Sequence, residues 1–197
     1  MPKENQRITL TRRLMKEALL RLLETRELDK ISVTELCAAA DINRATFYRH
    51  YQIPRDVLME IQQDLYRNLL KSVKMPKTSE EIHPAIQKLC AFLEQNAELM
   101  RLILRNNTDA DFAAFVGTLY DDILSQVKEA GILPRLSDED LRLLVLYCAG
   151  GSYFILRQWL LGNVRKSARE MADYVYTLLN RTDWAALSTQ LGLTLKA

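Results

Sequence analysis

The chain has 197 residues, of which 48% are hydrophobic, and this is enough to form the core of one or two domains. Its formal net charge of +2 comes from the first 60 residues, which hold 11 lysines and arginines and nine aspartates and glutamates. No apolar run approaches the roughly 18 residues that span a bilayer, and the amino-terminal segment is polar. We therefore expect a cytoplasmic protein with no membrane partner.

Glycine and proline are scarce, and no convincing stretch alternates apolar with polar residues, so we predict an all-α fold of about nine to ten helices. Cys37, Cys90 and Cys148 are widely spaced in apolar surroundings, which predicts reduced core thiols. His50 and His83 lack the spacing of metal ligands. We expect no metal and no cofactor.

The first helix is predicted to run from Thr9 or Thr11 to Glu24, because leucines recur there at helical spacing. Three basic residues would then precede or open this helix, where free backbone N–H groups favour phosphate. These residues are Arg7, Arg12 and Arg13. An ordinary solvated surface explains Arg7 equally well.

The next two helices are marked by their caps. Ser32 and Glu35 have the spacing of a capping box, which predicts that a helix begins at Val33. Asp41 breaks the apolar periodicity, and Asn43 can cap a following helix that begins at Arg44. The pattern indicates two short helices joined by a tight turn.

Phe47 and Tyr51 lie four residues apart in this second helix and are expected to point inward. The polar residues between them then occupy the outer faces. Arginine can pair with a guanine edge, and hydroxyl, phenol and imidazole groups can donate to phosphate oxygens. Spacing alone fits a helix-turn-helix motif and a plain solvated helix face about equally.

The segment resembles the DNA-binding end of the tetracycline-repressor (TetR) family of bacterial transcription regulators. The similarity covers about residues 8 to 60 and is most specific at TFYRHY, residues 46–51. It implies that Thr46, Tyr48 and His50 contact DNA and that Arg44 reads a base. The full set predicted to contact a double-stranded operator is Thr34, Asn43, Arg44, Ala45, Thr46, Tyr48, Arg49, His50 and Arg55.

Two positions depart from the family pattern. Asp41 stands where many members have glycine, and aspartate can adopt the same turn. Pro54 stands where many members have a lysine that touches a phosphate, and proline cannot supply a charge. Arg55 is the candidate replacement for that phosphate contact.

A long fourth helix is predicted to begin at Pro54 and to end before Met75. We expect a helix-turn-helix DNA-binding domain over residues 1–53, joined by this helix to a ligand-binding and dimerisation domain over residues 54–197. Ser137 and Ser167 are expected to cap two of the later helices. The later helices are predicted over about 84–95, 97–106, 109–130, 138–161, 168–180 and 183–191.

Gly150 and Gly151 lie inside a predicted helix, where each costs about 1 kcal/mol relative to alanine. Close helix approach or a local bend would explain them. The stretch CAGGSYFILRQWLLG resembles the penultimate helix of one TetR-type C-terminal domain, which implies a homodimer formed through a four-helix bundle. The residues predicted for this interface are Gly150, Gly151, Phe154, Ile155, Trp159 and Tyr174. Alternatively, Phe154 and Trp159 fill the core of one subunit.

An effector pocket between bundle helices would be lined by apolar and aromatic side chains. The candidates are Phe92, Leu99, Met100, Leu104, Phe112, Phe115, Tyr120, Tyr147 and Tyr153. Each could equally belong to a plain helical core, and the sequence does not name the effector.

These patterns predict a sequence-specific DNA-binding transcriptional regulator, a homodimeric repressor that binds a pseudo-palindromic operator and is released by a small molecule. The alternatives are an activator or co-regulator of the same fold, and a helical adaptor that binds only protein. An enzyme is not expected, because no serine or cysteine is matched with a free histidine: His50 already belongs to the DNA motif.

Overall fold

The computed structural model describes residues 2–74, 76–106 and 137–181, and within these ranges the protein is all-α. Its contacts divide the chain into two compact units, each considered by itself below. Unit one comprises Met1–Asn68 with Glu98–Asn106, and unit two comprises Leu69–Ala97 with Asn107–Ala197. The helices predicted over 109–130 and 183–191 lie outside the described residues, as do Phe112, Phe115 and Tyr120.

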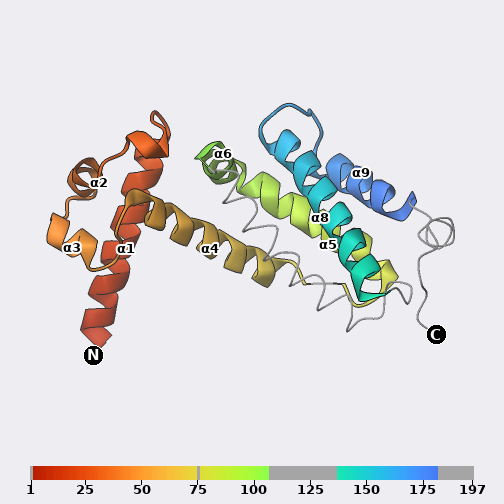
Figure 1. The fold of residues 1–197 in the computed structure, drawn as a ribbon, viewed down its shortest axis with the longest axis horizontal. Coiled ribbons are helices and arrows are strands. Elements are labelled where there is room, and N and C mark those ends of the chain that lie inside the picture. The colour runs from red at the N-terminus through yellow and green to blue at the C-terminus, as the bar shows by residue number, and fades with distance from the viewer. Residues whose placement is uncertain (1, 75, 107–136, 182–197) are drawn as a thin grey trace. The chain divides into compact units, whose positions relative to one another are not determined.

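Unit one contains five α-helices and one 3-10 turn. Helix α2 packs on α1, and α3 packs on α2 (Figure 1). Met15, Leu19, Leu36, Phe47 and Leu58 are the largest side chains that are fully enclosed in this core. The elements are α1 (Pro2–Leu23), η1 (Leu28–Lys30), α2 (Val33–Ala40), α3 (Arg44–Tyr48), α4 (Pro54–Ser72) and α6 (Ala97–Asn106).

Helix α1 begins at Pro2, well before the predicted start at Thr9 or Thr11. Its first turns have no apolar stripe to reveal them, although proline suits the first helical position and the residues that follow are adequate helix formers. The expectation that Arg12 and Arg13 open the helix is therefore wrong. Both lie well inside α1, where Arg12 pairs with Glu60 and Arg13 with Glu17.

Helix α4 begins at Pro54, as predicted, and buries Val57, Leu58, Ile61 and Leu65 in unit one. At its other end Leu69–Ser72 belongs to unit two. The helix is therefore continuous across the boundary between the units. With 19 residues it is about 28 Å long.

Unit two is built from α5 (Ser79–Gln95), α8 (Asp138–Leu160) and α9 (Ala168–Arg181) in its described part. Helix α9 contacts both α5 and α8 (Figure 1). Cys90, Met171, Ala172 and Val175 form the centre of this packing.

The predicted start of α5 at residue 84 is wrong, because the helix begins at Ser79 and includes Pro84. Glu80 and Glu81 lie in the first turn, where acidic side chains interact favourably with the helix dipole. The Glu81 carboxylate also accepts a hydrogen bond from the Lys77 backbone N–H at 2.8 Å. These interactions establish the helix before the proline is reached.

The caps predicted for the later helices are confirmed. The Ser137 hydroxyl accepts from the Asp140 N–H at 3.1 Å, and Ser167 with Glu170 forms a reciprocal pair. Gly162, with φ +84°, adopts the left-handed conformation just after α8 ends.

The expectation that no apolar run approaches the length of a membrane span is wrong: helix α8 is long and apolar enough to cross a membrane, judged by length and composition alone, with a mean hydropathy of 1.2 over its best window. Only 22% of that window is buried inside the protein. Helices that pack in protein cores and interfaces have the same composition, so this is weak evidence for a membrane span.

All three cysteines are free thiols. Cys37 and Cys90 are buried, as predicted, whereas Cys148 is only half-buried. Burial raises the pKa of Cys90 and of Cys148 to about 11.

Candidate nucleic-acid interface

The start of α2 is fixed by a complete capping box. The Ser32 hydroxyl accepts from the Glu35 N–H, and the Glu35 carboxylate accepts from the Ser32 N–H at 3.0 Å. Arg26 donates to the same carboxylate at 2.5 Å. The hydrogen bond from Arg26, followed by those from Ser32, lowers the pKa of Glu35 to about 2. The sequence prediction for this helix start is confirmed.

The turn between α2 and α3 has the geometry that its residues favour. The backbone of Asp41 adopts the left-handed conformation, with φ 52° and ψ 48°, which aspartate tolerates better than most residues. The Asn43 side-chain oxygen then accepts from the Thr46 N–H at 2.7 Å and caps α3. Both caps predicted from the sequence are therefore present, and α3 begins at Arg44.

Phe47 of α3 and Tyr51 beyond its end are both buried, as predicted, but the prediction that Tyr51 belongs to this helix is wrong, because α3 ends at Tyr48. Phe47 has no exposed surface and Tyr51 is 5% exposed, with their ring centroids 5.9 Å apart. The Tyr51 hydroxyl donates to Glu60 of α4 at 2.8 Å. The pKa of Tyr51 is raised, mainly by burial and secondly by the hydrogen bond to Glu60.

The Glu60 carboxylate of α4 interacts with both Tyr51 and α1. Besides Tyr51, its carboxylate binds Lys16 at 2.6 Å and Arg12 at 3.1 Å, both from α1. Burial alone would raise the pKa of Glu60, but the hydrogen bonds from Lys16 and Tyr51 leave it lowered. The residues on which α3 rests are thus linked to both α1 and α4.

The outer face of α3 is polar and accessible. Arg44, Ala45, Tyr48 and Arg49 are exposed, whereas Thr46 is half-buried. The Arg44 guanidinium donates to the Tyr48 hydroxyl at 3.3 Å and lies 5.8 Å from the centre of its ring. Within the described ranges no carboxylate forms a salt bridge with Arg44 or Arg49, so α3 keeps an uncompensated positive charge at each end.

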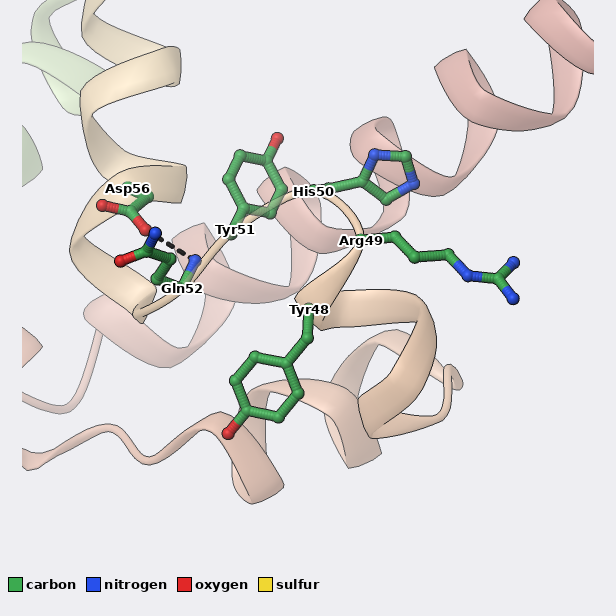
Figure 2. Close-up of a pocket in the computed structure, with 6 residues that line it drawn as sticks. All are labelled: Tyr48, Arg49, His50, Tyr51, Gln52 and Asp56. Atoms are coloured by element: carbon green, nitrogen blue, oxygen red, sulfur yellow. Dashed lines mark hydrogen bonds between the residues drawn. The ribbon is translucent and has the colours of Figure 1, made fainter.

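An open hollow of about 530 Å³ lies where α3 meets α4. Figure 2 shows Tyr48, Arg49 and His50 projecting from the chain in different directions around it. The remaining lining residues are Tyr51, Gln52 and Asp56. Three of the predicted DNA-contacting side chains, Tyr48, Arg49 and His50, therefore line this hollow, whereas Arg44 and Thr46 do not.

Acidic side chains already bind the polar groups at the start of α4. The Asp56 carboxylate accepts from the backbone N–H of Gln52 at 2.7 Å (Figure 2). It also accepts from the backbone N–H of Ile53 at 3.0 Å. Arg55, the proposed replacement for the phosphate-binding lysine, donates to Asp29 of η1 at 3.1 Å. Its phosphate contact stays a prediction, and a phosphate would have to compete with Asp29.

Sequence reasoning missed Asp29, Asp56 and Glu60. For Asp56 a signal existed, because an acidic residue three positions after Ile53 can reach back to that N–H as in a capping box. Asp29 and Glu60 gain their partners only through tertiary contacts, and no local pattern marks them. Thr34, the predicted contact on α2, is exposed.

The predicted effector-pocket residues are divided between the two units. Leu99, Met100 and Leu104 lie on α6 in unit one, with Leu104 buried. Phe92 lies on α5, and Tyr147 and Tyr153 lie on α8, all in unit two. Tyr147 is 71% exposed, whereas Tyr153 is half-buried. The pocket stays a prediction.

The predicted dimer residues fall into two groups. Gly151, Phe154 and Tyr174 are exposed, and Gly150 and Ile155 are partly exposed. Trp159 is only 8% exposed, and its indole N–H donates to the Lys166 carbonyl at 2.7 Å. Its position fits the alternative that Trp159 fills the core of one subunit.

The sequence matches no curated protein. A TetR family model, described as a transcriptional regulator C-terminal region, matches residues 80–181, which is more than half of the chain.

Solved structures share the fold. A TetR transcriptional regulator from Streptococcus agalactiae 2603V has a TM-score of 0.69 at 21% identity, covering 89% of this chain and 97% of that one. FadR from Bacillus halodurans, a fatty acid degradation regulator, has a TM-score of 0.59 at 17% identity, with coverages of 88% and 96%. The dihydroxyacetone kinase operon activator DhaS has a TM-score of 0.57 at 20% identity, with coverages of 86% and 94%. With an all-α fold and a matching family model, this chain belongs to the TetR family of transcriptional regulators, which are transcription factors and not enzymes.

Proposed function

We propose that this protein is a cytoplasmic, homodimeric repressor that binds a pseudo-palindromic DNA operator through α3 and releases it when a small molecule binds. The observation that carries the proposal is the outer face of α3, where Arg44 and Arg49 are exposed and form no salt bridge with a carboxylate in the described part of the chain. Uncompensated arginines at an accessible helix face suit both phosphate and guanine.

Rigid support of α3 favours sequence reading over loose electrostatic binding. Its first turn is capped by Asn43, Phe47 anchors its inner side, and the buried Tyr51 fixes the chain just beyond its end. A five-residue helix has little stability of its own, so these contacts determine where its side chains lie. We assign the operator contacts to Thr34, Asn43, Arg44, Ala45, Thr46, Tyr48, Arg49, His50 and Arg55.

Dimerisation is proposed through α8 and α9. Leu143, Tyr147 and Phe154 of α8 are 61%, 71% and 53% exposed, and Tyr174 and Leu178 of α9 are 50% and 45% exposed. Large apolar side chains gathered on two neighbouring helices are typical of a protein interface. A two-fold dimer would present two copies of α3 to half-sites separated by whole helical turns of DNA.

Effector release is proposed to act through α4. This helix carries Val57 and Leu58 in the core of unit one, and its last residues belong to unit two. A ligand bound among the helices of unit two could therefore move the last residues of α4 and, through Tyr51 and Glu60, the support of α3. We propose that the pocket lies in unit two, where Phe92, Tyr147 and Tyr153 are the described candidates, and we propose residues 54–197 as the ligand-binding and dimerisation domain.

The proposal is tested by selecting genomic fragments that the full-length protein retains and then measuring binding across salt concentrations. We expect one enriched pseudo-palindrome, and an affinity that falls with a log–log slope of about 0.9 per phosphate contact. The test variant combines Arg44→Ala with Arg49→Ala. Its control is Arg13→Ala, which replaces an exposed arginine of α1. Absence of salt-dependent binding to any duplex would favour a helical adaptor that binds only protein.

Activation is a second candidate. DhaS, whose fold this chain shares, is an operon activator. The position of the operator relative to the promoter discriminates the two functions, because a repressor site overlaps the polymerase site and an activator site lies upstream of it. A footprint on the target promoter would decide between them.

A further inference from the structure

Arg44 and Tyr48 form a pair on the exposed face of α3. They lie four residues apart, so their side chains meet on one side of the helix. The guanidinium donates through Nη2 to the Tyr48 hydroxyl at 3.3 Å and lies 5.8 Å from the ring centre. The phenol therefore restrains the guanidinium through both a hydrogen bond and a cation–π contact.

The Tyr48 ring is itself held in place. It packs edge-on against Phe47, with ring centroids 5.6 Å apart and an interplanar angle of 82°. Phe47 is fully buried in the core of unit one. Arg44 is thereby connected to the core through two aromatic rings, although its own side chain is exposed.

The contact leaves Arg44 able to bind a base. A guanidinium carries five N–H donors, and the Tyr48 hydroxyl uses one of them. Each terminal nitrogen keeps at least one N–H, so the fork that pairs with a guanine edge remains available. Other arginines of this unit differ, because Arg12, Arg26 and Arg55 bind carboxylates.

We propose that Tyr48 is a positioning residue for base selection, holding the Arg44 guanidinium in the orientation in which it reads the operator. This inference rests on the proposed function and deepens it, because the resemblance to the family gives Tyr48 only a DNA contact. Holding the guanidinium before binding lowers the entropy that Arg44 loses in the complex. The restraint also disfavours the side-chain orientations that would reach other bases.

A contact to phosphate and a positioning role predict different measurements. Loss of a phosphate contact weakens binding to every sequence by the same factor, whereas loss of positioning weakens discrimination at the base pair that Arg44 reads. The experiment measures the affinity of the full-length protein for the selected operator and for single base-pair variants at each position of the half-site. The variants are Arg44→Ala, Tyr48→Phe and the double substitution. The control is His50→Phe, because His50 lines the same hollow as Tyr48.

For Arg44→Ala we expect a loss of discrimination of about 5- to 150-fold at one base pair. Tyr48→Phe keeps the ring and removes the hydroxyl, so it should lower discrimination at that same base pair by about 2- to 10-fold. In the Arg44→Ala background, Tyr48→Phe should not change discrimination further. The control His50→Phe should weaken binding to all sequences alike.

The inference is overturned if Tyr48→Phe weakens binding equally to every operator variant, or if its effect on discrimination is unchanged in the absence of Arg44. Far-ultraviolet circular dichroism of each variant checks that α3 and the rest of the fold are retained. If the unsubstituted protein shows no sequence preference, the proposed function itself fails, and this inference fails with it. A preference that is present and insensitive to Tyr48 overturns the inference alone.

Discussion

Glu35 illustrates how a single carboxylate stabilises the start of α2. Its pKa is lowered from 4.5 to about 2, first by Arg26 and then by Ser32. A lowered folded-state pKa means that the stabilisation is present above about pH 4.5 and is lost as the pH falls toward 2. Glu35→Gln should therefore reduce the dependence of the unfolding free energy on pH in this window, measured by urea unfolding.

Ser32→Ala provides the companion measurement for Glu35. It removes the reciprocal hydroxyl and leaves Arg26 in place, so the pH dependence should fall by less than in Glu35→Gln. Other carboxylates with lowered pKa values, among them Glu60 and Asp64, contribute to the pH dependence of the unsubstituted protein. The difference between each variant and that protein is thus the relevant quantity. Identical curves for Glu35→Gln and the unsubstituted protein would contradict the assignment.

At the scale of elements, Glu60 joins α4 to α1 and to the end of the DNA motif. Its side chain is 16% exposed and accepts from Lys16, Arg12 and Tyr51. Glu60→Ala would leave Arg12 and Tyr51 without this acceptor, whereas Lys16 keeps Asp64, and we expect a loss of about 2 to 3 kcal/mol in unfolding free energy. Glu17→Ala, which breaks an exposed ion pair on α1, should cost under about 0.5 kcal/mol. Similar losses for the two variants in thermal or urea unfolding would refute this ranking.

Asp29 of η1 and Arg55 at the head of α4 form the second connection between elements. Asp29 is 80% exposed, so its ion pair contributes little stability and can exchange for a phosphate. Asp29→Asn should remove one carboxylate that competes with phosphate for Arg55, strengthen binding to random duplex DNA and increase the salt slope by up to about 0.9. The double variant Asp29→Asn with Arg55→Gln should lose this gain. If Asp29→Asn leaves the slope unchanged, Arg55 does not take over the contact that Pro54 lacks.

The sequence predicted helices best where side chains mark their ends. The starts at Val33, Arg44 and Pro54 were predicted correctly, because local hydrogen bonds or proline geometry determine them. The starts of α1 and α5 were missed. Polar first turns have no apolar period, and Pro84 resembles a first-turn proline although it lies inside a helix.

The candidate site was predictable to a similar extent. The inward position of Phe47 and the exposure of Arg44 follow from helical spacing, whereas Tyr51 is buried although it lies beyond the end of α3 at Tyr48. The pairing of Arg55 with Asp29 could not be predicted, since the two residues are 26 positions apart and meet only through packing. The orientation of Arg44 toward Tyr48 depends on rotamers, which a pattern of residue types does not specify.

At the scale of the whole molecule, the exposed apolar residues of α8 are the feature that the described part of the chain leaves unexplained. Phe154 is 53% exposed, and its ring packs edge-on against Tyr153 of the same helix. Phe154→Glu should convert the proposed dimer to a monomer in sedimentation equilibrium, and binding to the full operator should weaken far more than binding to a half-site. Met59→Glu alters a residue on α4 that is 46% exposed, and it should leave the dimer intact. Dimerisation that persists in Phe154→Glu would place the interface elsewhere.

Replacing Gly151 tests the same interface. The substitution should stabilise the isolated protomer and weaken the association of the dimer. No atom of the described residues lies within 4 Å of the Cβ that alanine would add, and the position is exposed. In a protomer made monomeric by Phe154→Glu, Gly151→Ala should therefore stabilise α8 by about 0.5 to 1 kcal/mol, because alanine loses less backbone entropy. In the dimer the same methyl group would separate two closely packed helices and raise the dissociation constant. An alanine that stabilises both the protomer and the dimer would show that Gly151 lies outside the interface and that the glycine pair has some other cause.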